Sequence, residues 1–168
     1  MGLDMNLEIE NYVSSYREDS APLLKKLDEV IGEMSEGAIP TLDVNGFVTV
    51  TNQVGYWRKA NAIHAWFVDN VQNGVDECQR SYVDPAILGE LRDLCLKLTD
   101  LRNDPDRQDE AITMVNEELP PQSGFFFGST DIDENYWYDV RVTGEFLDEF
   151  LAWHENNNTW SIYYQSSW

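Results

Sequence analysis

Basic residues are scarce in this chain of 168 residues, which has 11 Lys and Arg against 31 Asp and Glu and a formal net charge of -20 at pH 7. Because nucleic acids and anionic membrane surfaces are polyanions, this charge argues against direct binding to either. Hydrophobic residues still make up 42% of the chain and aromatic residues 12%. An acidic disordered segment lacks such residues, so we expect a folded protein with a sizeable core.

Long apolar runs are also absent, and the runs that occur extend over only a few residues, as in Phe125 to Phe127. A transmembrane helix needs about 20 consecutive apolar residues, so none is expected. The first ten residues include acidic residues but no basic one, which is not the pattern of a secretory signal peptide. These absences predict a cytoplasmic protein without a membrane partner.

Cysteine and histidine are equally rare, with two of each at Cys78, Cys95, His64 and His154. Their spacing matches neither a CxxC nor an HExxH motif, so we expect no metal site and no cofactor. Cys95 is spaced to join the apolar face of a helix, which predicts a buried free thiol. A disulfide is the alternative, although nothing in the sequence indicates an oxidising compartment.

The segment Asp131 to Asn135 imitates the opening of an EF-hand calcium loop. Such a loop needs glycine at its sixth position and glutamate at its twelfth, where this chain has Tyr136 and Val142. We therefore interpret these acidic residues as the N-terminus of a helix, where the helix dipole favours negative charge.

The apolar periodicity predicts three strands and five helices. The strands are expected over residues 3–10, 47–54 and 160–168, the second after a turn at Asn45-Gly46. The helices are expected from residue 20 to a stop at residues 37–40, and over 56–71, 84–101, 104–119 and 133–155. We predict an α+β fold, in which the N- and C-terminal strands pair in a small antiparallel sheet and four to five helices pack on it. No linker divides the chain, so residues 1–168 are expected to form a single acidic globular domain.

The first candidate site lies on the predicted helix over residues 56–71. Trp57, Asn61 and His64 have the spacing of one helix face, and Arg58 and Lys59 border it. An indole, a guanidinium, an amide and an imidazole on one edge suit a planar or anionic ligand. The alternative is a helix whose bases pair with the surplus carboxylates and whose histidine is buried in the core.

The second candidate is the aromatic segment Ser123 to Ser129, in which two serines and two glycines bracket three phenylalanines. Gly124 and Gly128 would let the backbone approach a ligand or adopt a positive φ, with Ser123 and Ser129 as binding residues. The segment lacks the Gly-Lys-Ser/Thr ending of a phosphate-binding loop. The alternative is a buried aromatic strand between two tight turns.

Several of these strings also occur together in one family. They are Met1 to Met5, Val54 to His64, Trp66 to Val68, Ser123 to Ser129 and Tyr164 to Trp168. On these strings, which lie at both ends and in the middle of the chain, the sequence resembles an uncharacterised family of small proteins encoded by tailed bacteriophages and prophages. The resemblance implies a phage origin, a single domain and a place in the cytoplasm of an infected host cell, but no reaction.

Two functions fit this combination of charge and motifs. The first is a binding protein whose acidic surface imitates DNA and inhibits a basic host protein, such as a defence nuclease or another nucleic-acid-binding protein. The second is a small-molecule binding protein or enzyme, with a nucleotide-like ligand held by Trp57, Arg58, Asn61 and His64. A minor virion component and an acidic surface that serves only solubility are the further alternatives. The sequence assigns no catalytic residue and no oligomeric state.

Overall fold

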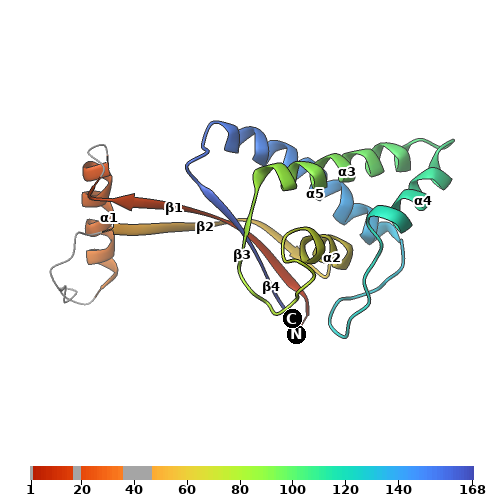
Figure 1. Ribbon diagram of the computed structural model, residues 1–168, viewed down its shortest axis with the longest axis horizontal. Coiled ribbons are helices and arrows are strands. Elements are labelled where there is room, and N and C mark those ends of the chain that lie inside the picture. Colours follow the sequence, from red (N-terminus) through yellow and green to blue (C-terminus); the bar gives the residue numbers. More distant parts are fainter. Residues whose placement is uncertain (1, 17–19, 36–46) are drawn as a thin grey trace. The chain divides into compact units, whose positions relative to one another are not determined.

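The computed structural model describes residues 2–16, 20–35 and 47–168, which form a four-stranded antiparallel sheet and five helices. In chain order these elements are β1 (Asp4–Ser14), α1 (Ala21–Met34), β2 (Phe47–Arg58), α2 (Asn61–Asn70), β3 (Ser81–Val83), α3 (Pro85–Asn103), α4 (Gln108–Glu118), α5 (Glu134–Glu155) and β4 (Ser161–Ser167). The strand order is β2-β1-β4-β3, so the first and last strands are neighbours at the centre of the sheet (Figure 1). The predicted α+β class is confirmed, whereas the expected turn at Asn45-Gly46 and the stop at residues 37–40 lie outside the described residues.

The chain forms two compact units, one of residues 1–9 and 53–168 and one of residues 10–52. The larger unit holds the hydrophobic core and four of the helices, α2 to α5. The expectation of a single domain stays a prediction.

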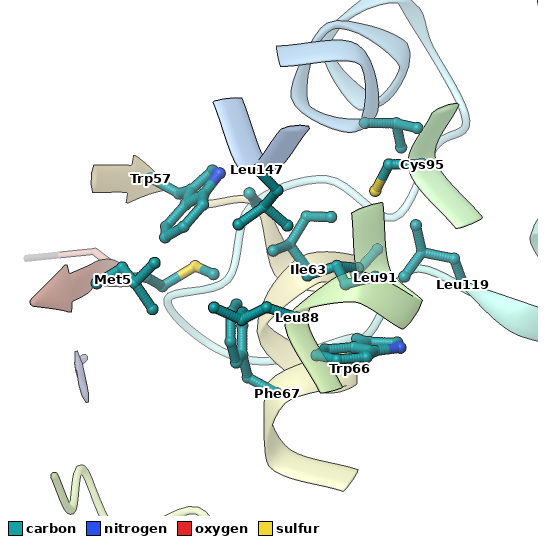
Figure 2. Close-up of a cluster of buried hydrophobic side chains, with 14 of the residues drawn as sticks. Met5, Trp57, Ile63, Trp66, Phe67, Leu88, Leu91, Cys95, Leu119 and Leu147 are labelled. Carbon is teal, nitrogen blue, oxygen red and sulfur yellow. The ribbon is translucent and has the colours of Figure 1, made fainter. Parts of the chain in front are cut away.

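The core of the larger unit lies on one face of the sheet. Along the start of β1 the apolar residues are buried and the polar residues between them are half-buried, as the period of two predicts. Figure 2 shows how Met5 of β1 and Phe67 of α2 lie among leucines of α3 and α5. In the same core the ring of Tyr164 from β4 stacks on Phe67, with ring centroids 4.0 Å apart. The terminal strands and α2 therefore share one core.

The long helices α3 and α5 pack along one another above this core (Figure 1). Asp84 caps α3 by accepting a hydrogen bond from the backbone N–H of Ala86, and Pro85 follows as the first helical residue, at the start of the helix expected over residues 84–101. Gly144 of α5 lies so close to α3 that an added Cβ would be 3.1 Å from the Cβ of Cys95. The predicted free thiol is confirmed, because Cys95 is fully buried and unbridged, and burial raises its pKa to about 12.

The predicted helix over residues 56–71 is wrong at its beginning. β2 continues to Arg58, and α2 begins only at Asn61. Buried and exposed residues alternate along the last part of β2, which is the period of a strand. The helical spacing of Trp57, Asn61 and His64 therefore joins residues of two different elements.

The alternative of a buried aromatic strand in the segment Ser123 to Ser129 is also wrong. Phe127 donates its backbone N–H to the carbonyl of Gly124, which closes a turn, and no strand forms in this segment. Phe127 is buried, but Phe125 is 94% exposed. Three consecutive phenylalanines thus do not share one environment, because a turn points its side chains in different directions.

Two further differences concern α4 and β3. α4 begins at Gln108 and not at the predicted Asp104-Pro105, because Asp104 accepts hydrogen bonds from the N–H groups of Asp106 and Arg107 and so forms a turn. β3 has only three residues, which is too short for a pattern to be recognised in the sequence.

The smaller unit contains α1, whose helical periodicity the sequence predicts. None of the residues of α1 is buried, although its apolar residues recur at the spacing of one helix face. Leu23, Val30 and Met34 are 48%, 50% and 82% exposed. In the same unit the rings of Tyr12 and Phe47 lie in contact, with centroids 5.0 Å apart.

Candidate functional site

The larger unit contains a pocket of about 460 Å³. Its walls are the turn between β2 and α2, the beginning of α2, the backbone that follows Phe127 and the first turns of α5. Four of the predicted site residues line it, namely Arg58, Lys59, Asn61 and Ser129. The pocket therefore brings residues of both candidate segments together. They come from the end of β2, the turn after it, the beginning of α2 and the backbone after Phe127, and not from one helix face.

Lys59 forms the turn between β2 and α2 and has an unusual backbone conformation. Its φ is +61°, in the left-handed region that a side chain makes costly. The turn is held by a hydrogen bond from the N–H of Lys59 to the carbonyl of Leu3 at 2.8 Å and by one from the N–H of Asn61 to the carbonyl of Lys59 at 2.9 Å. Gly128 lies against this turn, because an added Cβ there would be 3.2 Å from the Cβ of Lys59. Strained residues of this kind are concentrated at functional sites.

Lys59 and Arg58 supply the positive charge of the pocket. Within the described residues the ammonium group of Lys59 forms no ion pair. The Nε of Arg58 is 3.9 Å from a carboxylate oxygen of Asp4, and 62% of the Arg58 side chain is exposed. Asp4 also accepts a hydrogen bond from the hydroxyl of Tyr56, which raises the pKa of that phenol. Lys59 is thus the freer of the two cations.

The carboxylates of the pocket differ in how they are satisfied. Asp133 caps α5, and hydrogen bonds from the N–H groups of Tyr136 and Asn135 hold its pKa below the usual value. Asp131 accepts a hydrogen bond from the hydroxyl of Ser129 at 2.9 Å. Asp139 forms no hydrogen bond or ion pair with another described residue, and burial, with the nearby charge of Asp133, raises its pKa to about 6. Of these three carboxylates, only that of Asp139 accepts no hydrogen bond from a described residue, so both of its oxygens can accept hydrogen bonds from a ligand.

Asn61 lines the pocket, but its amide is occupied by the backbone. Its Nδ2 donates to the carbonyls of Phe127 at 3.1 Å and Ser129 at 2.7 Å, and its Oδ1 accepts from the N–H of Gln122 at 3.0 Å. Both amide hydrogens are therefore used. Asn61 is a positioning residue that holds the segment 122–129 against α2.

The other predicted site residues do not line the pocket. Trp57 is buried and donates its Nε1–H to the hydroxyl of Thr143 at 2.8 Å. His64 is fully buried, with Nδ1 2.7 Å from the hydroxyl of Tyr164 and Nε2 3.0 Å from a carboxylate oxygen of Asp76. Ser123 is exposed and lies outside the pocket lining. The alternative of a histidine satisfied in the core describes His64 correctly.

Tyr138 and Asp139 are among the pocket residues that sequence reasoning missed. Tyr138 is 58% exposed, and the guanidinium of Arg141 lies 5.5 Å from the centre of its ring. The sequence contains a signal for Asp139, which lies beside the apolar stripe of its helix. Asp139 directly precedes the buried Val140 and follows the buried Tyr136 by three residues. A carboxylate beside the apolar stripe of a helix is a candidate for function, since its burial needs compensation.

Within residues 2–16, 20–35 and 47–168, no group of three or more His, Cys, Asp or Glu side chains could hold a metal ion. None of the helices in these ranges is long and apolar enough to cross a membrane. Comparisons of the chain with models of protein families, with curated proteins and with solved structures find no match.

Proposed function

We propose that this chain binds a small anionic ligand, such as a phosphate-bearing metabolite, in the pocket beside Lys59. The observation that carries the proposal is the ammonium group of Lys59, which lines a pocket next to Arg58 and pairs with no described carboxylate. In a chain with a net charge of -20, most of the surface repels anions. The pocket also contains carboxylates, but Asp131 and Asp133 accept hydrogen bonds from neighbouring groups, so the unpaired ammonium group of Lys59 is the favoured place for an anion.

The size and composition of the pocket support this function. Its volume of about 460 Å³ is in the range of small-molecule sites. Apolar residues from α2 and α5, Ala62, Ile63 and Val140, line it together with the charged ones. Such a mixture suits a ligand with a flat or apolar part and a charged end. On the family resemblance, the ligand is a molecule of the host cytoplasm that a phage protein sequesters or acts on during infection.

Binding of inorganic phosphate and of nucleoside monophosphates, measured by isothermal titration calorimetry, tests this proposal. We expect Lys59→Ala to weaken phosphate and nucleotide binding about tenfold, because one charge-assisted hydrogen bond is lost. Arg58→Ala is expected to have a smaller effect, since that guanidinium is shared with Asp4. Lys97→Ala is the matched control, because Lys97 is exposed on α3 and does not line the pocket. No binding by the wild type, or equal affinities in all variants, would contradict the proposal.

A second candidate function is the inhibition of a basic host protein through an acidic surface, as the sequence suggests. The observation that favours it is the charge of the segment around α4. This segment has one basic residue, Arg107, among six acidic ones, Asp104, Asp106, Asp109, Glu110, Glu117 and Glu118. Arg107 is itself paired with Glu110 at 2.8 Å. The remaining carboxylates would attract a basic groove, such as that of a nucleic-acid-binding protein.

The salt dependence of capture from host lysate tests this second candidate. A partner of this kind is expected to be basic, to dissociate as the salt concentration rises and to be lost from the double variant Glu117→Lys, Glu118→Lys. Both side chains are exposed on α4, so the variant should fold. Capture that is indifferent to salt and to this charge reversal would argue against the acidic surface as the binding element.

A further inference from the structure

We propose that Asp139 recognises the other end of the ligand and that the ligand is a guanine nucleotide, with its phosphate at Lys59 and its base at Asp139 and Tyr138. This inference rests on the proposed function, and it adds the identity of the base. It starts from the two charged groups of the pocket that form no hydrogen bond or ion pair with a described residue, the ammonium group of Lys59 and the carboxylate of Asp139. A ligand that satisfies both must carry an anionic group and a hydrogen-bond donor.

The two groups come from different elements. Lys59 belongs to the turn after β2, and Asp139 lies in the second turn of α5. They line the same pocket but form no ion pair with each other. Their charges are therefore available to the two ends of one bound molecule. A nucleoside monophosphate has its phosphate and its base at opposite ends and is of a size that suits a pocket of about 460 Å³.

The chemistry of a lone carboxylate selects among the bases. An ionised carboxylate is an acceptor only, and its two oxygens can accept two parallel hydrogen bonds. Guanine presents two adjacent donors, N1–H and the N2 amino group, on its pairing edge. Adenine and cytosine present one donor beside one acceptor, which would leave an acceptor facing the carboxylate. At pH 7.5 Asp139 therefore favours guanine.

The aromatic ring of Tyr138 supplies the surface on which a base can stack. Tyr138 precedes Asp139 in α5, lines the same pocket and is 58% exposed. Stacking of a base on an aromatic side chain favours every base to a similar degree. Tyr138 thus increases the affinity for any base, and Asp139 makes the site selective for guanine.

The protonation state of Asp139 should change this choice. The pKa of Asp139 is raised to about 6, so the carboxyl becomes neutral at pH 5 and then offers one donor and one acceptor. That pattern matches adenine and cytosine. The other ionisable groups that line the pocket are Arg58, Lys59, Asp131, Asp133, Tyr136 and Tyr138. The affinity ratio of GMP to AMP isolates Asp139, because the phosphate and these other groups are common to both complexes.

Calorimetric titration of the full chain with GMP, AMP, CMP, UMP and inorganic phosphate at pH 7.5 and pH 5 tests the inference. We expect GMP to bind about tenfold more tightly than AMP at pH 7.5, with the ratio falling at pH 5. Asp139→Asn replaces one acceptor by a donor and should remove or reverse the preference at both pH values. Glu149→Gln is the matched control, since Glu149 is exposed on the same helix and outside the pocket, and it should keep the preference.

The outcomes separate this inference from the proposed function. Equal affinity for the four nucleotides, or a guanine preference that survives in Asp139→Asn, would overturn the role of Asp139. If Lys59→Ala still weakened phosphate binding in that case, the anion site would stand. Absence of binding to phosphate and to every nucleotide would overturn both proposals.

Discussion

At the scale of single residues, the side chain that the sequence indicates most clearly for ligand binding, that of His64, instead stabilises the fold. His64 lies between Asp76 and Tyr164 and is fully buried. Because a carboxylate only accepts, Nε2 of His64 donates to Asp76, and in the neutral imidazole Nδ1 then accepts from the hydroxyl of Tyr164. The other oxygen of Asp76 accepts from Nε1 of Trp168 at 3.1 Å. His64 thus connects α2 to Tyr164 in β4, and Asp76 connects His64 to Trp168, the residue that follows β4.

We therefore expect Asp76→Ala to lower the free energy of unfolding by about 1–3 kcal/mol, because it leaves the buried His64 donor without a partner. Urea denaturation followed by tryptophan fluorescence measures the change. Glu77→Ala is the control, because the side chain of the neighbouring Glu77 is exposed, and it should change little. An unchanged midpoint in Asp76→Ala would show that water replaces the carboxylate at no cost.

Lys59 combines a strained backbone with the freest cation of the pocket. Replacing it by glycine removes the cost of the left-handed conformation, so Lys59→Gly should be more stable than Lys59→Ala by about 1 kcal/mol. Both variants should lose phosphate affinity equally, because both lack the ammonium group. Urea denaturation measures the difference in the free energy of unfolding, and calorimetry on the same samples measures the loss of phosphate affinity. A glycine variant no more stable than the alanine variant would mean that the turn carries no strain.

The ionisation of Asp139 makes the free energy of unfolding depend on pH. Its pKa in the folded chain is about 6, above the usual value of 3.8, so the folded state binds the proton more tightly than the unfolded state. The ionised form destabilises the fold, and this cost appears as the pH rises through the interval between the two values. Asp139→Asn should therefore be more stable than the wild type at pH 7.5 and equally stable at pH 3.5. Thermal unfolding at the two pH values checks the difference, and a variant that is less stable at pH 7.5 would contradict it.

At the scale of elements, the sequence predicts what local signals determine. α3 and α5 begin where Asp84 and Asp133 can cap them, and β4 follows from strict alternation. The end of β2 escapes prediction, because the left-handed turn at Lys59 has no glycine to indicate it. Of the candidate site, Arg58, Lys59, Asn61 and Ser129 could be found from their motifs. The apolar stripe of α5 indicates Asp139 as a candidate, but its place beside Lys59 could not be predicted, because it depends on the packing of distant segments.

The contact between α3 and α5 can be tested with two glycines that differ only in their surroundings. An added Cβ at Gly144 would lie 3.1 Å from Cys95 and 3.2 Å from the backbone nitrogen of Leu96, whereas Gly89 has no atom within 4 Å of such a Cβ. Gly144→Ala should therefore lower the free energy of unfolding by about 1–3 kcal/mol through overpacking. Gly89→Ala should raise it by about 0.5–1 kcal/mol, since alanine favours the helix. Urea denaturation measures both, and changes of the same sign would contradict the close packing of the helices.

At the scale of the whole molecule, the charge of -20 and the apolar residues are distributed unequally. Most arginines of the larger unit are paired with carboxylates, as in the pairs of Arg102 with Glu134 and of Arg141 with Glu145. Lys59 and Lys97 form no ion pair with a described residue, and of these two lysines only Lys59 lines the pocket. The core belongs to the larger unit, while α1 in the smaller unit buries none of its residues.

Because α1 buries none of its residues and α3 packs on the core, the two helices should differ in local stability. A helix of 14 residues without a buried face is marginal in water, so the amides of α1 should exchange with deuterium much faster than those of α3, whose buried leucines support it. Hydrogen exchange followed by mass spectrometry compares peptides from residues 21–34 and 85–103 in one sample. Equal protection of the two helices would contradict the prediction, because it would mean that the apolar face of α1 is covered in solution. Repeating the measurement at a tenfold lower protein concentration would then show whether a second copy provides that cover, since only protection by association is lost on dilution.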